Sequence, residues 1–249
     1  MAVGSLKLFI QSLANRAGYQ IRRLDRDVDL NDALSEQRRL LGPSVRTIFE
    51  VGAADGRDAA QYAAWYPEAD VYAFEPVPES FESLMKFAAD HPRLHGFQCA
   101  LSNRQGQARF NLGNWLDASS LLKARDTGAT FDAYQASSRA IDVRTETIDD
   151  FCRSHDISHI DLLKMDTQGA ELLVLEGAER MLETGSIDII YTEMQFAELY
   201  EGAALADQII GKLGRQGYRL HNLYDPHHNQ RGELCWSDAI FVRRAARRT

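Results

Sequence analysis

The chain has 249 residues, 45% of them hydrophobic, which is enough for one large α/β core or two small ones. Its 36 acidic residues outnumber the 28 Lys and Arg residues, and the net charge of −8 argues against a phosphate backbone as the main binding partner, so we expect no nucleic-acid partner. The cysteines, Cys99, Cys152 and Cys235, are widely spaced and form no C-x-x-C pair, which indicates reduced thiols and no zinc site.

Residues 1–44 precede the main domain, which we place at 45–249, and they begin with a helical pattern. The apolar positions that share one helix face are Leu6, Phe9, Ile10, Leu13 and Ala17. This face suits packing on its own domain or on a second subunit in a homo-oligomer, and peripheral contact with a membrane is the alternative. The chain has no run of about 18 apolar residues and no secretory signal, so we expect a cytoplasmic protein.

From Val45 onward, short β-rich runs alternate with segments of helical period, the pattern of a mainly parallel sheet with helices on both faces. The expected strands of this sheet are residues 46–51, 70–74, 97–101, 160–165 and 187–191. The expected helices are 58–65, one that opens with Pro78, 171–182, and one marked by Leu205, Ile209 and Leu213. In the helix after Pro78, the predicted inward positions are Phe81, Leu84, Met85 and Ala88.

Three further segments complete the predicted fold. Residues 108–112 suit an extra strand, and residues 113–140 read as a loop-rich insertion. Thr147 followed by Asp150 predicts a helix N-cap with an acid in the first turn. The runs 218–223 and 239–242 predict an antiparallel pair. We therefore expect an α/β fold with a seven-stranded sheet and a C-terminal antiparallel hairpin.

The first informative motif is FEVGAADGRD, at the end of the first expected strand. Glu50 precedes the strand end, and Gly52 and Gly56 bracket a turn that also contains Ala53 and Asp55. Glycines let the backbone approach a ligand closely, and the following helix N-terminus attracts negative charge. A nicotinamide site normally has G-x-G-x-x-G, whereas the spacing here is G-x-x-x-G.

A second motif follows the second expected strand, where Glu75 and Pro76 stand in YAFEPVP, with Glu75 19 residues after Gly56. An acid at this place can bond both ribose hydroxyls of an adenosine, in nicotinamide and S-adenosylmethionine sites alike. The alternative is a solvated Glu in a turn. From the expected strand order, the adenine should lie against Ala100, Leu101 and Ser102.

Residues 143–178 read VRTETIDDFCRSHDISHIDLLKMDTQGAELLVLEGA, which resembles the signature of the FkbM-type methyltransferases. The likeness rests on TIDD before a helix, a strand that ends in KMD, then GAE and the VLEGA helix. The segments FEVGAADGRD, FEPVPESFESL, CALSNRQGQARF and DAIFVRR are also similar to family segments, so the resemblance covers about residues 45–244. It implies a Rossmann-like class I fold and methyl transfer from S-adenosylmethionine, typically to oxygen on a sugar, polyketide or other secondary metabolite.

The chain departs from the family pattern at two positions. The first-strand acid is Glu50 where Asp is usual, which keeps the charge but lengthens the reach. After Asp166 the chain has Thr167-Gln168-Gly169, where many members have Val-Glu-Gly. If that family acid is a metal ligand or a base, its role is open in this chain.

Methyl transfer is an in-line displacement, so positioning can supply up to about 7–11 kcal/mol of the acceleration. A base is needed only for a poorly acidic hydroxyl, and the carboxyl ends of the fourth and fifth strands offer Asp166 and Glu193, respectively. The structural alternatives are a helix N-cap for Asp166 and a loop contact for Glu193. His221 is the third candidate base. With Asp238 the two acids would suit Mg²⁺, but three separated acids do not support a metal.

Two expectations concern the surroundings of this site. Lys164 stands inside an apolar run and should reach an acid such as Glu171 or Asp166. Acceptor choice should come from residues 114–138 and 191–202, where Trp115, Tyr134 and Tyr200 are candidates to stack on a sugar, and Ser119 and Ser120 to touch either ligand. The competing hypotheses are a nicotinamide-dependent oxidoreductase and a non-catalytic binding or scaffold protein.

Overall fold

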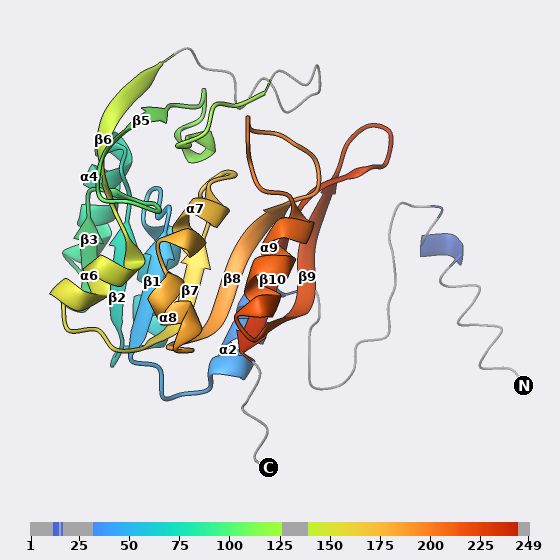
Figure 1. Cartoon of the computed structure of the whole chain (residues 1–249). Helices are drawn as coiled ribbons and strands as arrows, with labels where there is room; N and C mark the ends of the chain where they lie inside the picture. The colour runs from blue at the N-terminus through green and yellow to red at the C-terminus, as the bar shows by residue number, and fades with distance from the viewer. Residues whose placement is uncertain (1–11, 15, 17–31, 126–138, 244–249) are drawn as a thin grey trace, which may run out of the picture.

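The computed structural model describes residues 12–14, 16, 32–125 and 139–243 (Figure 1). Most of the predicted N-terminal amphipathic helix lies outside the described residues, as does Tyr134. None of the helices within the described ranges is long and apolar enough to cross a bilayer.

Seven strands form the main sheet, in the order β3-β2-β1-β7-β8-β10-β9. Their bounds are β1 Thr47–Val51, β2 Asp70–Phe74, β3 Leu94–Phe97, β7 Ile160–Met165, β8 Ile187–Gln195, β9 Tyr218–His228 and β10 Leu234–Arg243. The first five pair in parallel, while β10 runs antiparallel to both β8 and β9. This confirms the predicted mainly parallel sheet with its C-terminal antiparallel hairpin. The strand order reverses at β1 and β7, where open α/β sheets bind ligands.

Helices cover both faces of this sheet, as predicted. One face packs against α2 (Ala33–Leu41), α3 (Arg57–Trp65) and α4 (Pro78–Ala88). The other face packs against α6 (Ile148–Ser154), α7 (Glu171–Glu176), α8 (Glu179–Glu183) and α9 (Ala206–Arg215), and α7, α8 and α9 lie in front of the strands in Figure 1. Strand residues such as Phe49, Leu163 and Ile190 are fully buried. Each such side chain stabilises the fold by about 1.5–3 kcal/mol relative to exposure.

Several predicted helix signals act as expected. Pro78 stands in the first turn of α4, and the Thr147 side chain accepts a hydrogen bond from the backbone N–H of Asp150 at 3.0 Å at the start of α6. Leu84 is fully buried at the inward face of α4. The prediction for Met85 was wrong, because its side chain is 42% exposed and lies at the sheet edge beside Gly96.

The predicted third strand is in fact two strands in different sheets. β3 ends at Phe97, and β4 (Ala100–Leu101) joins a second sheet of order β4-β6-β5. The extra strand expected at 108–112 is confirmed as β5 (Gly106–Asn111), but β6 (Ala140–Glu146) was not predicted. In its sequence, AIDVRTE, polar and apolar residues are interspersed, so β6 has no apolar run to mark it.

Three boundaries also differ from prediction. The expected helix over 171–182 is broken at Gly177 into α7 and α8, where a Cβ atom would stand 2.0 Å from the Ser102 carbonyl oxygen. β8 extends to Gln195, so Glu193 lies within the strand and not in a loop after it. Strand β9 extends to His228.

Candidate functional site

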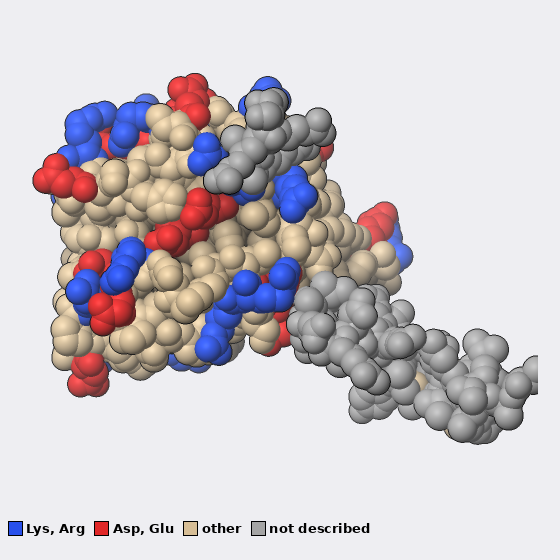
Figure 2. Space-filling view, turned by 90° about the horizontal axis from the view of Figure 1, so that it is seen from below, with Lys and Arg blue, Asp and Glu red and all other residues tan. Residues whose placement is uncertain are grey.

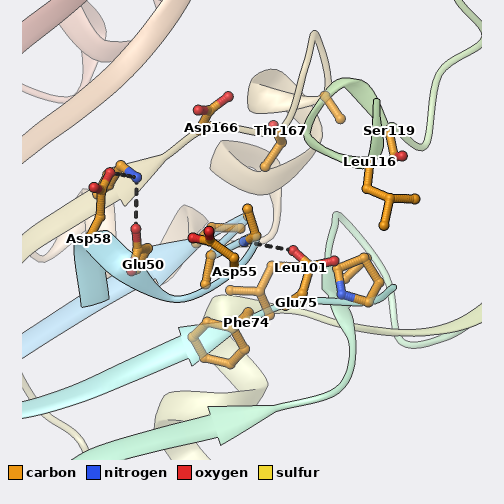
Figure 3. Close-up of a pocket in the computed structure, with 18 of the residues that line it drawn as sticks. Glu50, Asp55, Asp58, Phe74, Glu75, Leu101, Leu116, Ser119, Asp166 and Thr167 are labelled. Atoms are coloured by element: carbon orange, nitrogen blue, oxygen red, sulfur yellow. Dashed lines mark hydrogen bonds and ion pairs between the residues drawn. The ribbon is translucent and has the colours of Figure 1, made fainter. Parts of the chain in front are cut away.

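A pocket opens at the carboxyl ends of β1, β2 and β7, between the glycine turn and the short 3-10 helix η1 (Leu116–Ala118) (Figure 3). Most of the predicted cofactor residues line it: Glu50, Gly52, Ala53, Asp55, Glu75, Pro76, Ala100, Leu101 and Asp166. Gly56 and Ser102 do not. Gly56 instead packs against Leu84 of α4, and Ser102, directly after β4, lies beside Gly177.

Gly52 lies close to the backbone of both strands that flank β1, namely β2 and β7. The backbone N–H groups of Gly52 and Ala53 both donate to the Phe74 carbonyl oxygen at 3.0 Å. Gly52 has φ +80, and a Cβ atom there would stand 2.0 Å from the Asp166 carbonyl oxygen. A residue with a side chain would have to separate β1 from β7 here, so glycine is what lets the turn lie this close to the backbone of Asp166.

Glu75 is fixed in the pocket wall by backbone donors. Its Oε2 accepts from the N–H of Ala54 at 2.9 Å and its Oε1 from the N–H of Val77 at 2.8 Å. The side chain is 5% exposed, and Figure 3 shows it facing the glycine turn. A carboxylate oxygen can accept more than one hydrogen bond, so these two backbone bonds do not prevent Glu75 from accepting from ligand hydroxyls.

A charge network forms the floor of the pocket. Lys164 Nζ donates to Glu50 Oε1 and to Asp58 Oδ2, both at 2.7 Å, and not to Glu171 or Asp166 as predicted. Burial works to lower the pKa of Lys164, but the carboxylates of Glu50 and Asp58 outweigh it and raise that pKa well above its ordinary value. The ammonium is therefore a permanent positive charge at the pocket floor.

One carboxylate oxygen of Glu50 is not used by the charge network. Its Oε2 is buried and has no hydrogen-bond partner among the described residues. Burial raises the pKa of Glu50 to about 7, against the opposing effect of Lys164. A buried acceptor without a partner costs about 1–3 kcal/mol, which makes this oxygen a place for a ligand donor.

Asp166 lies at the opposite wall, where Figure 3 shows it across the pocket from Glu75. Its side chain is exposed, and its Oδ1 accepts from Gln168 Nε2 at 2.8 Å. The alternative role of helix N-cap does not hold, because the N-cap of α7 is Ala170. The turn is capped instead by Glu171, which accepts from the N–H groups of Thr167 and Gly169.

Glu193 and Asp238 stand side by side, as register partners on β8 and β10, but neither lines the pocket. Burial, together with the carboxylates of Asp166, Glu171 and Asp238, raises the pKa of Glu193 well above its ordinary value. Burial also raises the pKa of Asp238, whose Oδ2 accepts from the Tyr191 hydroxyl at 2.5 Å. Glu193 thus supplies a second carboxyl group near Asp166, in a more buried environment.

The predicted third base, His221, is not in the pocket. It lies on the edge strand β9, where its Nε2 is 2.5 Å from Glu36 Oε1 of α2. This contact connects a helix to the sheet and removes the support for a catalytic role.

The acids considered for Mg²⁺ do not converge on one point. Among the described residues, the group whose ligand atoms lie within 4.8 Å of one another is His159, Asp161 and Asp188, at the amino ends of β7 and β8, whereas the pocket lies at the carboxyl ends of the strands. Asp161 there already accepts from the backbone N–H groups of Arg46 and Thr47. The underside of the molecule, seen in Figure 2, carries acidic and basic side chains in mixed groups.

Sequence reasoning missed most of the apolar wall of the pocket and its charged floor. The lining residues that were not predicted are Val51, Ala54, Arg57, Asp58, Phe74, Phe110, Leu116, Leu121, Lys164, Thr167 and Ala170. Ser119, which was considered for ligand contact, does line the pocket. Of the aromatic candidates for sugar stacking, Trp115 is 63% exposed, whereas Tyr200 is 1% exposed and belongs to the core. The aromatic wall has no motif of its own, since it depends on how the second sheet folds over the first.

Comparison with known proteins gives consistent matches. The model of the family described as "Methyltransferase FkbM domain" matches residues 50–220. The "2-O-methyltransferase NoeI" of Sinorhizobium fredii (strain NBRC 101917 / NGR234) is 31% identical over 162 residues, which cover 62% of this chain and 65% of the relative. "Methyltransferase sdnD" of Sordaria araneosa is 28% identical over 160 residues, which cover 55% and 62%, respectively. The chain thus spans less than two thirds of the length of either relative.

Among solved structures, similar chains include a fibrillarin from Aeropyrum pernix in complex with natively bound S-adenosyl-L-methionine. It has a TM-score of 0.47 and 14% identity, and the match covers 95% of this chain and 74% of that one. An rRNA methylase from Streptococcus thermophilus has a TM-score of 0.48 and 10% identity, with 90% and 100% covered.

Proposed function

The chain belongs to the FkbM methyltransferase family, and from this premise we propose that it is an S-adenosylmethionine-dependent O-methyltransferase that acts on a hydroxyl group of a sugar, glycan or secondary metabolite. The observation that carries the proposal is the pocket in which Glu75 is fixed by the backbone of the glycine turn. The similarity to the 2-O-methyltransferase NoeI supports oxygen as the acceptor atom.

The pocket residues fit S-adenosylmethionine in three chemically different parts. Glu75 can accept from the ribose hydroxyls, and the apolar side chains of Phe74, Leu101 and Phe110 offer a slot for the adenine. The unpartnered Oε2 of Glu50 is placed for a cationic donor such as the amino group of the methionine part. When bound, the cofactor supplies a methyl group activated by its sulfonium.

Asp166 is the residue that we assign as base. Its carboxylate is exposed at the pocket wall, so it can take the proton of an acceptor hydroxyl at one of its oxygens. Glu193 is less suited to start this step, because burial and the neighbouring carboxylates raise its pKa and so favour its neutral form. We therefore propose that Glu193 is a neutral neighbour that limits the negative charge around Asp166.

The test is calorimetric titration of the full chain with S-adenosylmethionine, S-adenosylhomocysteine and NAD. We expect micromolar binding of the two sulfur ligands, no binding of NAD, and at least a tenfold loss of affinity in Glu75→Ala, because two ribose contacts disappear. Glu82→Ala, an exposed acid on α4, is the matched control and should bind as the parent does. Folded parent protein that binds NAD but neither sulfur ligand would contradict the proposal and favour an oxidoreductase.

Transfer is then tested by a panel of methyl hexosides, methyl pentosides and phenols with methyl-labelled S-adenosylmethionine. A labelled methyl group on a hydroxyl oxygen of a glycoside supports the sugar acceptor, and a labelled methyl group on a phenol oxygen supports a secondary metabolite. Protein that binds the cofactor but labels none of the panel, and none of a cell extract, would point to the scaffold hypothesis.

A further inference from the structure

Behind Asp166 lies a short chain of hydrogen bonds that the family signature does not account for. Gln168 Nε2 donates to Asp166 Oδ1 at 2.8 Å, and the Tyr200 hydroxyl donates to Gln168 Oε1 at 2.7 Å. Of these three residues, only Asp166 lines the pocket. Tyr200 is 1% exposed, so the end of the hydrogen-bond chain that is away from the pocket lies in the protein interior.

The chemistry of the three groups fixes the direction of both bonds. An ionised carboxylate only accepts, so the Gln168 amide must turn its NH₂ group toward Asp166. Its carbonyl oxygen then faces Tyr200 and needs a donor, which the phenol supplies. The opposite amide orientation would set two acceptors against each other at 2.8 Å.

The backbone at this turn is held in an unfavourable conformation. Gln168 has φ 54, in the left-handed region that non-glycine residues seldom adopt. The next residue, Gly169, has φ +93, and a Cβ atom there would stand 3.1 Å from both Tyr200 and Ala203. Such strain costs of order 1–3 kcal/mol and persists where the surroundings impose it, often at functional sites.

Two separate segments impose this conformation. Ser120, from the excursion after β5, donates to the Thr167 carbonyl oxygen at 3.2 Å. Tyr200, from the segment after β8, packs with Leu199 and Ala203 in a small apolar cluster. The turn that carries Asp166 is thus clamped between the two segments expected to form the acceptor side of the pocket.

We propose that Gln168 and Tyr200 are positioning residues, which hold the Asp166 carboxylate in one orientation toward the acceptor through the bonds from Tyr200 to Gln168 and from Gln168 to Asp166. The inference deepens the proposed methyl transfer and rests on it for the role of Asp166 as base. At position 168, where many family members have Glu, this chain therefore places a hydrogen-bond donor toward Asp166 in place of a like charge. A displacement of about 1 Å at a reacting group can cost a hundredfold in rate.

The orientation of Asp166 can be measured without any ligand. Three-bond couplings from the backbone to the Asp166 carboxyl carbon report its χ1 angle, in protein labelled at aspartate and assigned with Asp166→Asn. We expect one rotamer in the parent and averaged couplings in Gln168→Met, which keeps the side-chain length but loses the donor. Tyr200→Phe should give partial averaging of these couplings. It removes the hydrogen bond to the Gln168 carbonyl oxygen but leaves the bond from Gln168 to Asp166.

The matched controls are Gln61→Met and Tyr66→Phe. Gln61 is exposed on α3, and the Tyr66 hydroxyl has no hydrogen-bond partner among the described residues. Both controls should leave the Asp166 couplings unchanged. Unchanged couplings in Gln168→Met, with its amide resonances still those of a folded protein, would overturn the inference.

Kinetics give the second readout, with a glycoside methylated in the panel described above. Gln168→Met should lower kcat about tenfold or more while the Kd for S-adenosylmethionine stays within twofold, because the cofactor contacts are intact. A loss confined to KM or to cofactor affinity would contradict a positioning role. Absence of cofactor binding by the parent would overturn the proposed function. The couplings would still show, in that case, whether Gln168 holds the Asp166 side chain in one rotamer.

Discussion

Glu50 is the residue in which the pocket's electrostatics can be measured most directly. Its fully buried carboxyl has a pKa raised from 4.5 to about 7, by burial first and in spite of Lys164. The folded state therefore binds a proton that the unfolded state has already lost above pH 4.5. By linkage, the stabilisation from this group is complete below about pH 4.5 and is lost as the pH rises through about 7.

The prediction is a difference in pH dependence between the parent and Glu50→Gln. The free energy of unfolding of the parent should fall relative to that of the variant between pH 5 and 8, by up to about 3 kcal/mol, because the folded-state pKa of about 7 lies well above the unfolded value of 4.5. Urea unfolding at four pH values measures it, and Glu82→Gln serves as the exposed control. Parallel curves for parent and Glu50→Gln would show that Glu50 does not take up the proton.

At the level of single residues, the sequence predicted the polar part of the site better than the apolar part. Gly52 and Glu75 carry a spacing that follows from backbone approach and ribose chemistry, and both line the pocket. Phe74 and Phe110 reach the pocket from different sheets, so no local pattern marks them. Lys164 was expected to find an acid, but which acid depends on the packing of α3 against β7.

Among the elements, the parallel strands were predicted closely, since β2 and β7 are short apolar runs bounded by polar turns. The errors lie where tertiary contacts override local pattern. Residues 171–182 have an unbroken helical pattern, yet the chain bends at Gly177 because the Ser102 carbonyl oxygen approaches it. The second sheet went partly unpredicted because β6 alternates between exposed and buried positions without an apolar run.

This close approach makes Gly177→Ala a test at the element scale. The backbone of Gly177 has φ −76, which alanine adopts easily, so any cost comes from the contact with Ser102 and not from strain. A Cβ atom 2.0 Å from a backbone oxygen must push α7 away from β4, and we expect a loss of about 1–3 kcal/mol in urea unfolding.

Gly214→Ala in α9 is the matched control for that variant. No atom lies within 4 Å of a Cβ there, so the helix preference of alanine should stabilise the protein by up to about 1 kcal/mol. Equal effects of the two substitutions would mean that the approach of Ser102 to Gly177 is not as tight as the structure shows.

Across the whole molecule, α2 is attached to the methyltransferase core although it lies before the residues matched by the family. The Glu36 carboxylate is buried, with Arg39 Nη2 at 2.6 Å on α2 and His221 Nε2 at 2.5 Å on β9. Gln37 on the same helix accepts from the Tyr62 hydroxyl of α3 at 2.7 Å. These contacts join α2 to the edge strand β9 and to α3, the helix that follows the glycine turn, and no residue of α2 lines the pocket.

The contacts of α2 should therefore contribute to the stability of the fold and have little effect on cofactor binding. Glu36→Gln leaves Arg39 and His221 without their carboxylate, and we expect a loss of about 2 kcal/mol at pH 7, or roughly 4–8 °C in Tm. Affinity for S-adenosylmethionine should change less than twofold, since no residue of α2 lines the pocket. A large loss of affinity would instead mean that α2 supports the pocket through α3.

The pH dependence of this loss follows from the sign of the Glu36 shift. Arg39 and, to a smaller extent, His221 lower the pKa of Glu36 below its ordinary 4.5 against the effect of burial. The stabilisation is present above that value and is lost as the pH falls through the folded-state pKa, because the unfolded state then binds the proton first. Thermal unfolding curves of parent and Glu36→Gln, well separated at pH 7, should converge at low pH. If the difference in Tm between the two proteins stays constant down to pH 3, the loss of stability comes from packing around position 36 and not from the charge of Glu36.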